Sequence, residues 1–364
     1  MEKKLIIFIP SIEDGGVEKN LYLISNYLSD KLRSIEIITC NNNYKKKFSS
    51  KINIVSPNSK FFWNQKRWVK YIICLIILFY KIINDRKVVI FAFQANIYAV
   101  LIAKILNVKI ITRSNSSPSG WSQNFLKNLI FKFLLKRSDS IIVNSLAFQK
   151  EFYSKFQIST TFIYNPFCKK LINKKIKTKI KNDFFKKKNL KIINVGRLTK
   201  QKDQITILKA FRLINKKLKP KLIIVGKGSE YKFLQNYINN NGLNANVKLF
   251  GYTDNPFSLI KSSNIVLLTS KFEGLPNILL EAQYLKKYII STDCPTGPNE
   301  ILSNGNYGTL IKIGDYKELA KKINNYYKQK KLINKMILKG YSAMDRFDYR
   351  ANCEKYFKLI KKLI

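Results

Sequence analysis

Short apolar runs alternate with helix-length segments along the whole of this 364-residue chain. Such runs of apolar and β-branched residues, separated by long segments, are typical of buried parallel strands that are joined by helices. The first half of the chain holds runs at 5–9, 35–39, 88–93, 109–112, 140–143 and 161–164. The second half holds runs at 191–195, 221–225, 247–250, 264–269, 288–291 and 309–311. The pattern predicts an α/β protein with two doubly wound, Rossmann-like domains.

A lysine-rich stretch separates the two sets of runs. Residues 169–190 have no clean periodicity, and Asp183 is their single acidic residue. We interpret this stretch as a basic linker between an N-terminal domain at 1–168 and a C-terminal domain at 191–344. Because ligands bind outside the carboxyl ends of the strands in such sheets, two facing halves imply a ligand cleft between them.

The charge of the chain is strongly unbalanced, with 67 Lys and Arg against 22 Asp and Glu and a formal net charge of +45. Such an excess favours anionic partners, namely nucleic acid, an anionic membrane or phosphorylated substrates. A compositional drift toward Lys, Asn and Ile is an alternative explanation for part of it. The five cysteines are scattered without a C-x-x-C pair, so neither a disulfide framework nor a zinc site is expected. The chain has no histidine, which removes the commonest general base.

The most lipid-like segment is the unbroken apolar run at 71–80, which Lys70 and Lys81 flank. Its length is half of the roughly 20 residues that a membrane-spanning helix needs. The run predicts either a buried helix or a helix that lies in a membrane interface with its lysines beside the headgroups. At the N-terminus, the apolar stretch before Pro10 is too short for a signal peptide and predicts a first strand.

The stretch at 265–281 predicts a strand, a tight turn and a helix N-terminus in succession. The apolar run ends at Thr269, Gly274 and Pro276 break the chain, and a helix then continues through Glu281. Backbone N–H groups at such a helix start can donate to an anionic or hydroxyl-rich ligand. Glu273 and Glu281 lie on this turn and helix and can face one crevice about 10 Å apart. Carboxylates can accept hydrogen bonds from the hydroxyls of a sugar and of a ribose. The alternative is an ordinary pair of solvent-exposed glutamates, which is common on helices at this spacing.

The full string at 272–281, F-E-G-L-P-N-I-L-L-E, resembles the glutamate-seven-residues-glutamate motif of family 4 retaining glycosyltransferases. That family is typified by bacterial cell-envelope sugar transferases and has the GT-B fold. The resemblance implies two Rossmann-like domains that face each other across a cleft, with a final helix at 345–364 that crosses back to complete the N-terminal domain. It also implies that Glu281 holds the ribose of the nucleotide and that the donor sugar is held by Glu273, Gly274, Leu275, Pro276 and Asn277.

Two further loops follow predicted strands and could bind phosphate. Gly15 and Gly16 lie between the first strand and a helix, where a glycine pair lets the backbone approach a ligand and frees N–H groups for it. This loop resembles the family's glycine loop, which lies against the donor phosphates and the acceptor. Arg197 and Lys202 flank the turn after the run at 191–195, and their string resembles the family's diphosphate-binding motif. The resemblance implies that both cations neutralise the departing nucleoside diphosphate.

Three more segments carry a resemblance. The segment at 225–230 resembles the family's V-G-x-G-x-E segment, which is mainly structural. The string at 250–252, F-G-Y, resembles the loop that carries the base of the nucleotide, and the resemblance makes Tyr252 a candidate neighbour of that base. The Pro- and Gly-rich loop at 292–301 resembles the subset that builds polysaccharides or glycans on lipid carriers, often from UDP-N-acetylhexosamines. Many members place a histidine in the stretch that corresponds to 112–118. Since none exists here, we assign no general base, and the resemblance leaves Arg113, Ser114 and Asn115 as candidates for contact with sugar or acceptor.

Together these motifs predict a retaining glycosyltransferase of the hexosyltransferase type, with Arg197, Lys202 and Glu273 as its catalytic residues. The donor would be a UDP-N-acetylhexosamine or UDP-hexose, and the acceptor a lipid-linked saccharide of cell-surface polysaccharide or glycan biosynthesis. No D-x-D pair exists, so no metal or other cofactor is expected. We expect a cytoplasmic protein, peripheral on the anionic inner face of the plasma membrane, with no nucleic-acid partner. The alternatives are a non-catalytic polyanion-binding protein and, because of the missing histidine, an inactive transferase homologue.

Overall fold

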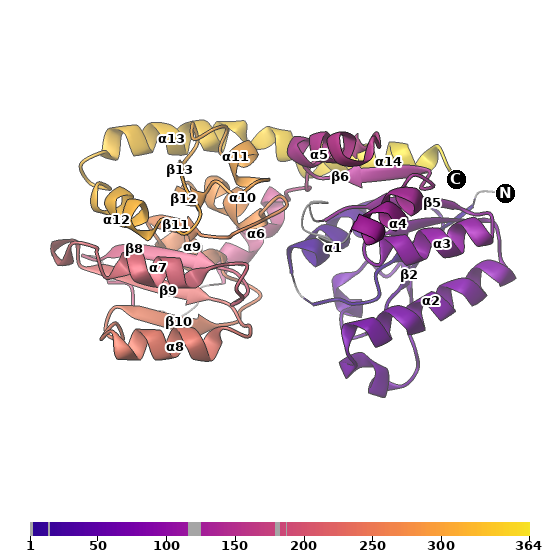
Figure 1. Cartoon of the computed structure of the whole chain (residues 1–364), viewed down its shortest axis with the longest axis horizontal. Coiled ribbons are helices and arrows are strands. Elements are labelled where there is room, and N and C mark those ends of the chain that lie inside the picture. Colours follow the sequence, from indigo (N-terminus) through magenta and orange to yellow (C-terminus); the bar gives the residue numbers. More distant parts are fainter. Residues whose placement is uncertain (1–2, 14, 116–124, 179–182, 187) are drawn as a thin grey trace. The chain divides into compact units, whose positions relative to one another are not determined.

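The computed structural model describes residues 3–13, 15–115, 125–178, 183–186 and 188–364. The chain divides into an N-terminal unit, Met1–Pro166 with Phe347–Ile364, and a C-terminal unit, Phe167–Arg346 (Figure 1). Each apolar run that the sequence marks as a strand coincides with a strand whose ends differ by at most two residues.

The N-terminal unit is built on a seven-stranded parallel sheet in the order β3-β2-β1-β4-β5-β6-β7. Its strands are β1 (Lys4–Phe8), β2 (Ile35–Ile38), β3 (Ile52–Val55), β4 (Val88–Ala92), β5 (Lys109–Arg113), β6 (Ser140–Val143) and β7 (Thr161–Phe162). Strand β3 was not predicted, because it is a four-residue edge strand that polar Asn53 interrupts. The Asn53 side chain donates to Glu36 on β2 over 3.3 Å, so its polar atom is satisfied by the neighbouring strand.

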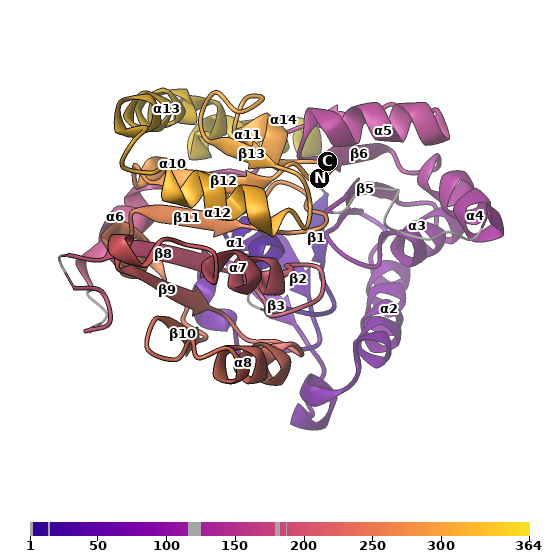
Figure 2. The same ribbon diagram turned by 60° about the vertical axis from the view of Figure 1, so that its left-hand side comes forward.

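Helices cover both faces of this sheet (Figures 1 and 2). They are α1 (Gly16–Ser29), α2 (Arg67–Asn84), α3 (Asn96–Ile105), α4 (Phe125–Leu135), α5 (Leu146–Phe156) and α14 (Tyr349–Lys361), with 3-10 turns at Lys45–Lys47 and Lys60–Asn64. On one face, Cys353, Tyr356 and Ile360 of α14 share a core with α1 and the central strands. The C-terminal helix therefore belongs to the N-terminal unit. On the other face, α2 and α3 pack on the same strands.

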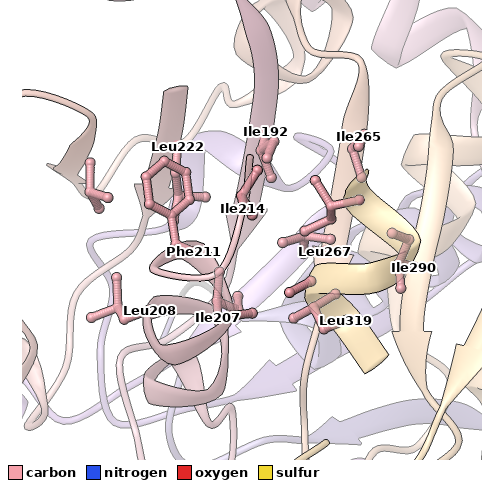
Figure 3. Close-up of a cluster of buried hydrophobic side chains, with 14 of the residues drawn as sticks. Ile192, Ile207, Leu208, Phe211, Ile214, Leu222, Ile265, Leu267, Ile290 and Leu319 are labelled. Atoms are coloured by element: carbon pink, nitrogen blue, oxygen red, sulfur yellow. The ribbon is translucent and has the colours of Figure 1, made fainter. Parts of the chain in front are cut away.

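The C-terminal unit is built on a six-stranded parallel sheet in the order β10-β9-β8-β11-β12-β13. Its strands are β8 (Leu190–Val195), β9 (Pro220–Val225), β10 (Val247–Gly251), β11 (Ile265–Leu268), β12 (Tyr288–Thr292) and β13 (Thr309–Ile311). Its helices are α6 (Lys169–Lys177), α7 (Gln204–Phe211), α8 (Tyr231–Asn240), α9 (Phe257–Ser262), α10 (Asn277–Tyr284), α11 (Pro298–Ile301), α12 (Tyr316–Asn324) and α13 (Lys330–Ser342), with 3-10 turns at Lys216–Leu218 and Ala343–Phe347. Figure 3 shows strand residues such as Ile192 and Leu267 packed against Ile207, Phe211 and Leu319 of the covering helices.

The predicted basic linker at 169–190 is wrong in its first half. Residues 169–177 form α6, which packs on α9 and belongs to the C-terminal unit. Ile172 is buried, and the Asn255 side chain donates to the backbone carbonyl of Lys175 over 2.9 Å. Most exposed positions of this helix are lysines, so its few apolar residues do not stand out as a helical pattern in the sequence. Residues 179–182 and 187 of the predicted linker lie outside the described residues.

The apolar run at 71–80 lies within α2. Cys74, Leu78 and Ile82 are buried in the core of the N-terminal unit, whereas Ile72 and Ile76 are half exposed. The buried interpretation thus holds for one face of the helix only. Across the described ranges, no helix is both long and apolar enough to span a membrane.

Candidate functional site

The predicted site residues of the C-terminal unit gather at one edge of its sheet. The parallel strands β9, β8, β11 and β12 are neighbours, so the loops that follow them lie side by side. The chain runs outward from β8 to β10 and then returns to β11 on the other side of β8, which makes β8/β11 the switch point of the sheet. Open parallel sheets bind their ligands in the crevice at such a point. Lys202 follows β8 and Glu273 follows β11, so they come from the two sides of this crevice.

Lys202 and Glu273 form an ion pair. The Lys202 ammonium Nζ donates to Glu273 Oε1 over 2.5 Å, and the side chains are 17% and 8% exposed. The Ser270 hydroxyl donates to the same carboxylate oxygen over 2.5 Å. Charge-assisted hydrogen bonds in a partly desolvated site are strong, and removal of one partner leaves the other charge uncompensated. Both residues were predicted, whereas their pairing and the role of Ser270 were not.

The loop after β12 holds the Glu273 turn in place. The Thr296 hydroxyl donates to the backbone carbonyl of Glu273. Gly297 has a φ of +84°, and a Cβ at this position would lie 1.8 Å from the carbonyl oxygen of Gly274 and 2.8 Å from Pro276 Cδ. Only glycine allows both this backbone conformation and this approach. Thr296 and Gly297 lie in the Pro- and Gly-rich string at 292–301, which is the sequence signal for their role.

The glycines after β9 support the loop that carries Arg197 and Lys202. A Cβ on Gly226 would lie 1.9 Å from the carbonyl oxygen of Gly196, and one on Gly228 would lie 2.2 Å from that of Leu198. The Leu198 N–H also donates to the carbonyl of Lys227 over 2.9 Å. This close backbone packing confirms that the segment at 225–230 is structural.

Arg197 and Tyr252 are the exposed members of the site. The Arg197 side chain is exposed, and its backbone carbonyl accepts a hydrogen bond from Gln204 over 2.9 Å. The Tyr252 ring is 44% exposed, and the Lys227 ammonium lies 4.7 Å from its centroid. An aromatic ring that is open to solvent can stack on a planar base.

Helix α10 begins directly after the Glu273 turn. Gly274 and Pro276 form the turn, Leu275 is buried, and the helix starts at Asn277 with Pro276 as its N-cap. Glu281 lies one turn into this helix and is 5% exposed. The order of strand, turn and helix N-terminus that the sequence predicted is confirmed.

Cys294 lies beside this site without being able to act as a nucleophile. Burial, followed by the negative charge of Glu273, raises the pKa of the Cys294 thiol to about 12. The thiol therefore stays protonated near neutral pH, and only a thiolate is reactive. In the ranges that the structure describes, no three His, Cys, Asp or Glu side chains are grouped so that they could hold a metal ion.

Gly15 and Gly16 lie at the corresponding switch point of the N-terminal unit, between β1 and β4. The expectation that the loop leaves its N–H groups to a ligand is wrong for Gly15. Its N–H donates to Glu18 Oε2 over 2.9 Å, and the Glu13 N–H donates to Glu18 Oε1 over 3.3 Å. Glu18 is buried, which raises its pKa, and it fastens the loop to the start of α1. Asp14 lies outside the described residues.

Arg113, which was predicted as a candidate contact for sugar or acceptor, lies in a buried hydrogen-bond network of the N-terminal unit. Its side chain is fully buried, and Nε donates to the Tyr356 hydroxyl over 3.1 Å while Nη2 donates to Asn165 Oδ1 over 2.7 Å. Nη1 donates to Asn115, whose amide in turn donates to the carbonyl of Phe93 over 2.8 Å. The guanidinium thereby joins β5, the chain after β7, and α14.

Ser114, the next residue in the chain, is also buried, at 4% exposure, and its backbone N–H donates to the backbone carbonyl of Ile142 over 2.9 Å. Asn115 is half-buried. Residues 116–118 of this predicted contact stretch lie outside the described residues. Arg113 and Ser114 are therefore part of the interior of the N-terminal unit, and Asn115 lies at its edge.

The sequence of the chain is similar to those of known glycosyltransferases. Residues 175–343 match the family model that is described as Glycosyl transferases group 1. Over 208 residues the chain is 35% identical to an uncharacterized glycosyltransferase of Methanocaldococcus jannaschii, and the match covers 54% of this chain and 51% of that protein. Over 247 residues it is 25% identical to the N-acetylgalactosamine-N,N'-diacetylbacillosaminyl-diphospho-undecaprenol 4-alpha-N-acetylgalactosaminyltransferase of Campylobacter jejuni, which covers 65% of each chain. The matches span about half of the first relative and just under two thirds of the second.

The whole fold is also similar to a solved structure. Anabaena HepE, in complex with UDP-glucose, matches with a TM-score of 0.80 at 21% identity, over 99% of this chain and 100% of that chain. At this identity the likeness establishes the fold, which is the GT-B fold with its two Rossmann-like domains.

Proposed function

We propose, on the premise that residues 175–343 of this chain are a glycosyl transferases group 1 domain, that the protein transfers a sugar from a UDP-sugar to a lipid-linked saccharide. The donor would be a UDP-N-acetylhexosamine or a UDP-hexose, and the product would retain the anomeric configuration of the donor. The acceptor proposal is supported by the Campylobacter relative, whose name specifies a diphospho-undecaprenol acceptor. The reaction would belong to the biosynthesis of a cell-surface polysaccharide or glycan.

The observation that carries this proposal is the Lys202–Glu273 pair at the β8/β11 switch point. An ammonium suits a diphosphate, and an ionised carboxylate accepts hydrogen bonds from sugar hydroxyls. In this structure each charge compensates the other. A UDP-sugar would supply a new partner to each, a phosphate to Lys202 and a hydroxyl to Glu273, so neither charge would be left unpaired.

The proposed reaction needs no metal, because side-chain cations would stabilise the leaving group. Lys202, together with the exposed Arg197, would offset the charge that develops on the departing diphosphate. The bond from the anomeric carbon to the phosphate oxygen breaks, and a bond to the acceptor oxygen forms on the same face of the sugar. The departing phosphate oxygen takes the acceptor proton, so the step requires no histidine.

Contacts with the rest of the donor follow from the same loops. Tyr252 would stack on the base, Glu281 would bind the ribose, and the backbone at 274–277 would bind the sugar. We propose that the protein works in the cytoplasm at the inner face of the plasma membrane, where a lipid-linked acceptor is presented.

The test measures nucleoside diphosphate release from UDP-, GDP- and ADP-sugars with a bacterial lipid-linked saccharide extract as the acceptor. We expect release from one donor, dependent on the extract, and its loss in Lys202→Ala, Glu273→Gln and Glu281→Ala. Lys200→Ala is the matched control, because Lys200 is an exposed lysine in the same loop. An equal loss in the control, or the absence of both release and donor binding in the unaltered protein, would refute the proposal.

A further inference from the structure

The outer face of α2 carries a row of exposed apolar side chains. These are Trp68, Ile72, Ile76, Phe79, Tyr80 and Ile83, and the exposure of Trp68 and Tyr80 exceeds 60%. Residues at this spacing lie on one side of a helix. The opposite side of α2 is apolar as well and is buried against the sheet. Since a helix that is apolar all round is normally covered all round, the outer row calls for a partner.

The apolar surface continues onto the neighbouring helices. Helix α3 packs on both α2 and α4, and Figures 1 and 2 show the three helices side by side. The exposed apolar residues of α3 are Tyr98, Leu101 and Ile105, and those of α4 include Leu126, Ile130 and Phe133. We call these residues together with the outer row of α2 the α2–α4 face. Soluble proteins rarely expose an apolar patch that spans several elements unless it binds something.

All charged residues of these three helices are basic. Their sequences contain Arg67, Lys70, Lys81, Lys104, Lys127 and Lys132 and no acidic residue. Lys81 and Lys104 form ion pairs with carboxylates of the underlying unit, at 3.1 Å from Glu36 and 2.9 Å from Asp139. Arg67 is exposed beside Trp68 at the start of α2. The face therefore combines an apolar surface, basic residues and exposed Trp and Tyr rings, which is the composition that favours a membrane interface.

We propose that the α2–α4 face is the surface by which this protein docks onto an anionic lipid bilayer. The apolar side chains enter the boundary between headgroups and acyl chains, while the Lys and Arg stems extend so that their charges stay among the anionic headgroups. A second copy of the chain fits less well. A symmetric dimer would bring this face against itself and oppose basic helices that contain no acidic residue to pair with.

This inference deepens the proposed function, because an acceptor on a lipid carrier is reached at a bilayer surface. It uses none of the residues of the candidate site, and its test does not depend on sugar transfer. The docking surface and the transferase can therefore be confirmed or refuted separately.

The experiment measures co-sedimentation of the full chain with vesicles of phosphatidylcholine, with and without phosphatidylglycerol. We expect the unaltered protein to bind the anionic vesicles at least ~10-fold more tightly, since each well-placed cation contributes roughly 5-fold. The double variant Ile76→Glu, Phe79→Glu should weaken that binding at least ~10-fold, because charged groups replace side chains that enter the lipid. The matched control is Leu332→Glu, Leu338→Glu on α13, whose side chains are 50% and 58% exposed, and it should bind like the unaltered protein.

Three results would overturn the proposal. They are a lack of binding to anionic vesicles, equal losses in the α2 and α13 variants, and sedimentation that shows a dimer which the α2 variant converts to monomers. The last result would assign the face to a second copy. If circular dichroism shows that the α2 variant is unfolded, Arg67→Gln with Lys70→Gln takes its place, and unchanged binding by that variant contradicts the proposal. UDP-sugar binding, measured on the same variants, should not change.

Discussion

Gly297 offers a sharp test of how the Glu273 turn is held. In Gly297→Ala, the new Cβ would lie 1.8 Å from the carbonyl oxygen of Gly274, whereas real Cβ contacts stay above 3.0 Å. The two loops must therefore separate by about 1.2 Å. Since Gly274 follows Glu273 directly, this shift displaces the carboxylate from its present position relative to Lys202 and Ser270.

The magnitude follows from two contributions. A left-handed conformation costs an alanine roughly 1–2 kcal/mol, and the overpacked contact adds about 1–3 kcal/mol to the loss of unfolding free energy. A misplacement of about 1 Å at a catalytic group lowers the rate by roughly 100-fold. We therefore expect Gly297→Ala to lose about two orders of magnitude in kcat/KM for nucleoside diphosphate release and about 2–5 kcal/mol of stability.

Gly314→Ala is the matched control for this experiment. Gly314 has a φ of +76°, close to that of Gly297, and a Cβ built on it meets nothing within 4 Å. The control should show only the cost of the left-handed conformation and keep its kcat/KM. Kinetic assays and urea unfolding of both variants would check this. Equal activities in the two variants would refute the argument that the loop contact positions Glu273.

Three further predictions test other parts of the structure. Lys202→Ala and Glu273→Gln should each lower the free energy of unfolding, because each leaves the other charge without its partner. The double variant should lose at least ~1 kcal/mol less than the sum of the two single losses, which urea unfolding of the unaltered protein and the three variants would measure. Burial lowers the pKa of Lys287 to about 8 from 10.5, so the charged lysine destabilises the folded state fully below pH 8 and not at all above pH 10.5. Lys287→Met should therefore raise the free energy of unfolding by on the order of 1 kcal/mol at pH 7 and leave it unchanged near pH 10.5. Urea unfolding at both pH values checks this, and an equal gain at both would contradict it. Arg113→Met removes the donors of a buried network and should cost about 2–4 kcal/mol, with faster hydrogen exchange in α14, while exposed Arg137→Met should change neither.

Much of the architecture was predictable because it depends on local pattern. A buried parallel strand needs a run of apolar residues whatever its neighbours are, and the twelve marked runs are strands. The strand, turn and helix around Glu273 were predictable for the same reason, since Gly274 and Pro276 act on the backbone locally.

The errors arose where local pattern is weak or misleading. Strand β3 is short, lies at an edge and contains Asn53. In α6, lysines surround the single buried residue Ile172, so composition resembled a linker. Gly15 was expected to serve a ligand, but the carboxylate that occupies its N–H comes from Glu18, three residues later.

What the sequence by itself determined is twelve of the strands that the structure describes, the two Rossmann-like halves and the residue types that can bind a phosphorylated sugar. Only the tertiary structure decided which of these residues meet. Lys202 and Glu273 are 71 positions apart and form a pair because β8 and β11 are adjacent at the switch point. Arg113 looked like a contact residue and is buried because α14, more than 240 positions later, supplies the Tyr356 hydroxyl that it needs. The physical reason is the same in both cases. A side chain's partners are set by strand order and helix packing, which bring together residues that no local pattern connects.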